Sequence, residues 1–133
     1  MFEVARTSIM INGIEHTAIA TPDPASLAQW YADTLGFVIN YRGKTAYFVK
    51  APDGTMLEII TSDGDAPETA MKTPGLRHLA LATTGFEAEL ERLRSLNVTF
   101  LTEPEIRGGN KVVFFTDPAG TILHLIERAE PLP

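Results

Sequence analysis

The feature that most constrains this chain is an internal duplication. Residues 13–21 align with residues 75–83 and share a Gly, a His, two Ala and a Thr at matching places. Residues 52–60 align with residues 118–126 and share a Pro, a Gly, a Thr, a Leu and an Ile. The first two segments are 62 residues apart and the other two are 66 apart, as a short loop insertion in one copy would produce. The sequence therefore predicts two related halves.

Each half is expected to contain one helix. In the first half, Asp23 is suited to cap the helix, Pro24 to occupy its first turn and Gly36 to end it in a left-handed conformation. In the second half, apolar residues at spacings of three and four predict a helix from about Phe86 to Asn97.

Runs of aromatic and β-branched residues, separated by turn residues, predict the strands. Beyond the first strand of each half, they are Phe37–Tyr41, Ala46–Val49 and Thr55–Ile60, then Val98–Leu101, Val112–Phe115 and Thr121–Ile126. Each half thus has the order β-α-β-β-β, so the expected fold class is α+β. We expect a single domain spanning residues 1–133, made of repeats 13–62 and 75–128 and a linker at 63–74.

Composition narrows the classes of function. A length of 133 residues with 44% hydrophobic content suits one globular domain, and a net charge of -6 disfavours a nucleic-acid partner. The sequence has neither an apolar stretch of about 18 residues nor a secretory signal, so we expect a cytoplasmic protein without a membrane partner. Because the chain has no cysteine, any metal must be held by nitrogen and oxygen.

The duplication relates four polar residues in pairs. His16 matches His78, and Glu58 matches His124, so all three histidines of the chain fall at duplicated places. Strand alternation groups each of the four with small or apolar neighbours, and it assigns Glu15 to the face opposite His16.

A single His or Glu on an apolar strand face is more often a hydrogen-bonded structural residue than a ligand. Four such residues at duplicated positions favour one divalent-metal site formed by His16, Glu58, His78 and His124. A cation would compensate a buried carboxylate, and three nitrogens with one oxygen suit Zn²⁺, Ni²⁺, Co²⁺ or Fe²⁺.

The chain resembles the vicinal oxygen chelate superfamily of glyoxalases, bleomycin resistance proteins and dioxygenases. The resemblance rests on Gly-Ile-Glu-His-Thr-Ala-Ile at residues 13–19, on residues 30–37 and on two Pro-x-Gly-x-x-x-(Glu/His) segments. It implies two tandem βαβββ modules forming a glyoxalase-like open barrel around one metal, with the same four residues as ligands. Many members carry a carboxylate where this chain has His124, so the resemblance does not imply a standard glyoxalase.

Two open metal positions would suit a small substrate with two neighbouring oxygens, which favours a lyase or isomerase that acts through a metal-chelated enediolate-type intermediate. Glu58, the only carboxylate of the set, is the expected catalytic base. An Fe(II)-dependent ring-cleaving dioxygenase, with His16, His78 and Glu58 as its triad, is one alternative. A non-catalytic drug-binding resistance protein is another.

The sequence leaves the roles of several residues outside this set open. Arg42, Arg107 and Lys111 lie near expected hairpin turns, where they would meet an anionic substrate or only the solvent. Residues 107–110 are expected to form a mobile lip because two glycines are adjacent there. Residues 1–12 precede the duplication and are expected either to pair with a second subunit of a homodimer, as the resemblance implies, or to fray.

Overall fold

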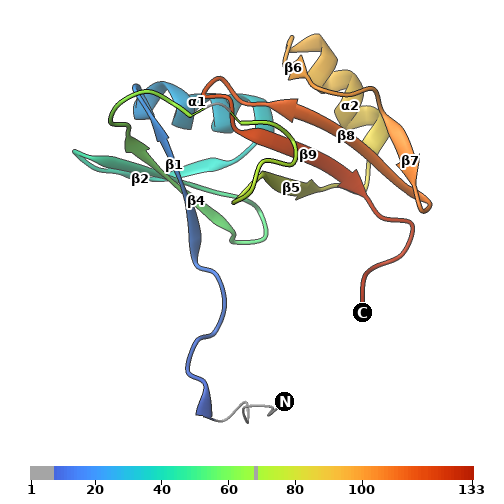
Figure 1. Cartoon of the computed structure of the whole chain (residues 1–133), viewed down its shortest axis with the longest axis horizontal. Helices are drawn as coiled ribbons and strands as arrows, with labels where there is room; N and C mark the ends of the chain where they lie inside the picture. Colours follow the sequence, from blue (N-terminus) through green and yellow to red (C-terminus); the bar gives the residue numbers. More distant parts are fainter. Residues whose placement is uncertain (1–7, 68) are drawn as a thin grey trace.

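The computed structural model describes residues 8–67 and 69–133, and it divides them into two modules of matching topology. The first module contains β1 (His16–Thr21), α1 (Pro24–Leu35), β2 (Val38–Arg42), β3 (Ala46–Lys50) and β4 (Met56–Thr61). The second contains β5 (His78–Ala82), α2 (Phe86–Ser95), β6 (Thr99–Phe100), β7 (Glu105–Arg107), β8 (Asn110–Thr116) and β9 (Ile122–Glu127). In Figure 1 both helices lie in the upper part of the view.

Each module forms its own mixed sheet. The strand order is β1-β4-β3-β2 in one sheet and β5-β9-β8-β6 in the other, with β7 added beside β8. The first and last strands of a module run parallel, and the other pairs are antiparallel. The expected α+β fold with two βαβββ modules is confirmed, and no closed barrel is formed by the described residues.

The capping residues act on α1 as expected. The Asp23 carboxylate accepts a hydrogen bond from the Ser26 amide at 3.1 Å, and Gly36 has φ +74°, the left-handed conformation that glycine adopts without a Cβ clash. The helix α2 is less well capped, because Gly85 provides no side chain, and it ends at Ser95, slightly before the expected Asn97.

The short strand β7 was not expected. Glu105, Ile106 and Arg107 include only one apolar residue, and all three are exposed, so they lack the alternation of a half-buried strand. They form a strand because Gly108 and Gly109, with φ of +56° and +82°, turn the chain back onto β8. The expected lip is therefore the tip of a paired hairpin.

One face of each sheet packs under the helix of its own module. Ile19, Leu57 and Ile59 lie in the first core cluster, and Leu123 and Leu125 lie in the second. These odd-numbered positions alternate with the even-numbered positions that carry His16, Glu58, His78 and His124.

The two cores are continuous through a few side chains. Trp30, Leu35 and Leu79 pack against both clusters. The buried Tyr31 hydroxyl donates to Asp117 Oδ2 at 2.7 Å, which links α1 to the second module. The modules of one chain are thus joined through their helix-facing sides.

The segment before β1 lies apart from both cores. Ile9, Met10, Ile11 and Ile14 are exposed, and in Figure 1 this segment extends away from the sheets. The expectation for residues 1–12 concerns in part residues 1–7, which are outside the described residues. None of the helices in the described ranges is long and apolar enough to cross a membrane.

Candidate metal site

His16 and Glu58 lie together on the outer face of the first sheet. β1 and β4 run parallel with Ala18 opposite Glu58, which puts the two side chains on the same face. Nε2 of His16 is 3.6 Å from Oε1 of Glu58, and their side chains are 36% and 27% exposed. This distance leaves room for a shared ligand between the two atoms.

The expectation for Glu15 was wrong. Its carboxylate accepts a hydrogen bond from Nδ1 of His16 at 2.8 Å. β1 begins only at His16, so Glu15 is not held to strand alternation. A carboxylate can only accept, so Nδ1 of His16 donates this hydrogen bond and Nε2 is the ring nitrogen that faces Glu58. Metal-binding imidazoles are commonly oriented by such an outer carboxylate.

The second module carries the matching pair. His124 lies opposite Ala80 on β5, next to His78, and the two imidazole rings are 5.2 Å apart at nearly perpendicular orientation. Phe114 stacks on His124 at 4.2 Å with an angle of 6° between the rings, and it makes an edge contact with His78 at 5.3 Å. In the first module Phe48 has the same place, opposite Glu58, with an edge contact to His16 at 5.4 Å.

His124 is electrostatically suited to act as a neutral ligand. Burial lowers its pKa, and the electrostatic influence of His78, Arg107 and Arg128 lowers it further. Its Nε2 is buried and has no hydrogen-bond partner within the described residues. A buried polar atom without a partner costs free energy, so a bound cation would satisfy an otherwise unfavourable arrangement.

The four predicted ligands thus form two pairs. Within the described ranges, no group of three or more His, Asp or Glu residues is close enough to hold one ion. Each pair still fits a transition metal by its chemistry: one imidazole with a carboxylate, and one imidazole beside an unpartnered one. For all four residues to bind one ion, the outer face of a first module has to meet the outer face of a second module.

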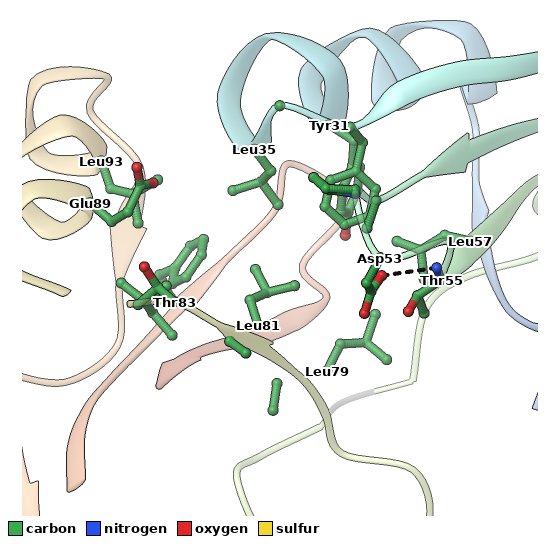
Figure 2. Close-up of a pocket in the computed structure, with 18 of the residues that line it drawn as sticks. Tyr31, Leu35, Asp53, Thr55, Leu57, Leu79, Leu81, Thr83, Glu89 and Leu93 are labelled. Carbon is green, nitrogen blue, oxygen red and sulfur yellow. Dashed lines mark hydrogen bonds between the residues drawn. The ribbon is translucent and has the colours of Figure 1, made fainter. Parts of the chain in front are cut away.

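A cavity of about 710 Å³ lies on the opposite side of the sheets, between the modules (Figure 2). Leucines of both modules form its walls, namely Leu35, Leu57, Leu79, Leu81 and Leu93. Among its polar groups, Asp53 accepts a hydrogen bond from the Thr55 amide, and Glu89 pairs with Arg92. None of the four predicted ligands lines this cavity. The outer faces are therefore the better candidate for chemistry.

Sequence reasoning missed two other contributors to these faces. Glu15 was assigned to the face opposite His16, although its carboxylate contacts that imidazole. Arg128 was not considered, although it follows β9 and its charge acts on His124. The same even-numbered parity that groups His124 with Ile126 continues to Arg128 and would have identified it.

The arrangement of two βαβββ modules with matched polar pairs has counterparts among known proteins. The family model of the Glyoxalase/Bleomycin resistance protein/Dioxygenase superfamily matches residues 13–125. The chain is 30% identical over 122 residues to an ethylmalonyl-CoA/methylmalonyl-CoA epimerase of Cereibacter sphaeroides, with 82% of this chain and 90% of the epimerase covered. This chain belongs to the glyoxalase/bleomycin resistance protein/dioxygenase superfamily.

Solved structures agree with this assignment. A glyoxalase family protein from Enterococcus faecalis is 26% identical with a TM-score of 0.76, covering 90% of this chain and 100% of that protein. Oxidase ChaP-H2 is 25% identical with a TM-score of 0.71, covering 90% of this chain and 95% of that protein. The same fold thus occurs in proteins named for different reactions.

Proposed function

We propose that this protein is a divalent-metal-dependent enzyme of the lyase or isomerase type, which moves a proton at a carbon next to a carbonyl group. The observation that carries the proposal is the pair of matched polar half-sites, of which only one contains a carboxylate. Similarity to an epimerase supports a reaction of this type. The substrate is expected to be a small oxygenated molecule.

The proposed ligands are His16, Glu58, His78 and His124. Bound there, a divalent ion supplies Lewis-acid polarisation of the substrate carbonyl and so makes the neighbouring C–H bond more acidic. The donor set of three imidazoles and one carboxylate suits Zn²⁺, Ni²⁺, Co²⁺ or Fe²⁺. Glu15 holds the His16 ring with Nε2 facing the site.

Glu58 is the proposed base. It is the only carboxylate among the four residues, and its side chain is 27% exposed, so a substrate can reach it. It lies 3.6 Å from His16 Nε2, so the proposed proton acceptor and the proposed imidazole ligand face the same site.

We further propose that the complete site forms between two copies of the chain. The modules of one chain pack through their helix-facing sides, by way of Trp30, Leu35 and the Tyr31–Asp117 hydrogen bond. Their outer faces, which carry the polar pairs, leave His16 partly exposed. A two-fold dimer brings the first module of one copy against the second module of the other, and the symmetry then creates two such sites.

Exchange of a carbon-bound proton tests the proposed reaction. The purified chain is loaded separately with Co²⁺, Ni²⁺ and Zn²⁺ and incubated with methylmalonyl-CoA in D₂O, and incorporation of deuterium at the α-carbon is followed by mass spectrometry. The wild type is expected to catalyse exchange with at least one ion. Glu58→Gln should lower the rate roughly 100-fold or more while metal stays bound, and the exposed-helix control Glu91→Gln should not.

Exchange that is equally fast in Glu58→Gln and the wild type would contradict the role of Glu58. Tight binding of a drug without metal and without turnover would instead identify a sequestering protein.

An Fe²⁺-dependent dioxygenase is the second candidate. Similarity to an oxidase favours it, and His16, His78 and Glu58 provide the two imidazoles and one carboxylate of such a centre. Oxygen uptake by the Fe²⁺-loaded protein with catechols, in the absence of proton exchange, would select this reaction.

A further inference from the structure

The second module places a cation next to its ligand pair. The Arg107 guanidinium carbon lies 5.7 Å from the centre of the Phe114 ring, within the range of a cation–π contact. Phe114 in turn stacks in parallel on His124. On the outer face of the second sheet, the Phe114 ring therefore lies between the Arg107 guanidinium and the His124 imidazole.

The first module repeats this arrangement without the cation. Phe48 has the place of Phe114, because each lies directly opposite the ligand on the last strand of its module. Besides His16, Phe48 contacts Tyr41, with ring centres 5.9 Å apart. The duplicated faces thus differ in charge: one combines Glu58 with Tyr41, and the other combines His124 with Arg107.

Arg107 is accessible to a ligand. Its side chain is 58% exposed at the end of β7, next to the glycine turn. It pairs with Glu105, with both Nε and Nη2 directed at one carboxylate oxygen of that residue. A guanidinium has five N–H groups in a planar fork, so donors remain for a second carboxylate. Arg128 adds a further positive charge close enough to act on His124.

We propose that Arg107 binds a carboxylate group of the substrate, so that the substrates of this protein carry a carboxylate close to the carbon that loses its proton. The location of the reacting group rests on the proposed function, whereas the binding of the carboxylate by Arg107 does not. The anionic end lies against the second module, and the carbon that loses its proton faces Glu58 of the first.

Malonate and its neutral counterpart malonamide test this inference by binding, independently of turnover. Both are titrated by calorimetry into the full-length chain, first metal-free and then loaded with Ni²⁺. The wild type should bind malonate and discriminate against malonamide. Arg107→Gln should weaken malonate binding roughly tenfold to 100-fold, the range for a lost hydrogen bond to a charged group, with malonamide unaffected.

Two variants sharpen the result. Glu105→Gln removes the residue that competes for the guanidinium, so it should strengthen malonate binding by roughly two- to fivefold. Arg94→Gln removes the same charge from the exposed side of α2 and should leave the affinity unchanged. A thermal melt of each variant verifies folding, and since Arg107 and Glu105 are both exposed, neither change empties a core position.

Equal malonate affinity in the wild type and in Arg107→Gln overturns the inference, and so does a wild type that binds no malonate. Arg107-dependent malonate binding by a protein that takes up no metal supports the inference while refuting the proposed function.

Discussion

At the scale of single residues, the buried Tyr31 hydroxyl is bonded to the carboxylate of Asp117. The Tyr31 side chain is fully buried, and burial together with the neighbouring Asp117 carboxylate raises its pKa well above the ordinary value. Asp117 in turn accepts amide hydrogen bonds from Ala119 and Thr121 on its other oxygen. One carboxylate thus fixes the turn before β9 and anchors α1 to the second module.

Replacing Tyr31 by Phe should destabilise the protein by about 1–3 kcal/mol at neutral pH, because it leaves a buried carboxylate oxygen without its donor. Urea unfolding measures this loss, and Asp117→Asn completes a double-mutant cycle.

The pH dependence gives an independent check. A group whose pKa is raised on folding adds stability that is fully present below its unfolded pKa of about 10. This stability is lost as the pH rises above that value toward the folded pKa. The wild type should therefore lose stability above about pH 10 more steeply than Tyr31→Phe. If the free energy of unfolding falls equally with pH in the two proteins, the burial of the Tyr31 hydroxyl is refuted.

His124 gives a prediction at acid pH. Because its pKa is lowered in the folded state, its contribution to stability is present above the ordinary value of 6.5 and is lost as pH falls below it. In the metal-free protein, urea unfolding between about pH 7 and pH 5 should show a steeper loss for the wild type than for His124→Asn. His16 and His78 are present in both proteins, so the difference reports the titration of His124 together with its coupling to His78. Identical slopes would contradict the burial of His124.

At the scale of elements, local sequence signals specify α1 almost completely. Asp23→Ala should cost about 0.5–2 kcal/mol because the Ser26 amide loses its acceptor, while Asp23→Asn retains an acceptor and should cost less. Thermal unfolding of both variants measures the cap. Equal losses would show that the charge of Asp23 matters and its hydrogen bond does not.

The strands show where sequence reasoning succeeds and where it fails. Alternation correctly placed Glu58 and His124 on one face of each sheet, because a strand buried on one side fixes the direction of every side chain. It failed at Glu15, which lies just outside β1, and at β7, which is exposed and depends on a glycine turn. Both failures lie at the ends or edges of elements, where neighbours outside the strand decide the conformation.

At the scale of the whole molecule, the sequence predicted the two modules but not how they meet. The duplication pairs His16 with His78 and says nothing about the distance between them. That distance depends on contacts such as Trp30 and Leu79, which join the modules on the helix side and have no local sequence signal. The binding of one metal by both pairs therefore remains a prediction.

Mixing two inactive variants tests the proposed sharing between copies. The double variant His16→Ala, Glu58→Gln lacks the first pair, and His78→Ala, His124→Ala lacks the second. If each site combines one pair from each copy, mixed dimers regain one intact site, and metal binding should recover to about half of the wild-type amount per mixed dimer. Metal analysis of dimers purified with two different affinity tags measures this. Full retention of metal by either double variant alone would contradict a shared site.

The central claim is that one residue pair from each module holds a single metal ion, and the metal content of singly substituted proteins tests it most directly. We expect about one divalent transition ion per chain in the wild type after loading and dialysis, and a large loss in both His16→Ala and His78→Ala, because each removes a ligand of the same ion. Thr17→Ala, on the opposite face of β1, should keep the metal. A wild type that folds and takes up no Zn, Ni, Co or Fe, or a His78→Ala variant that retains all of it, would contradict the account.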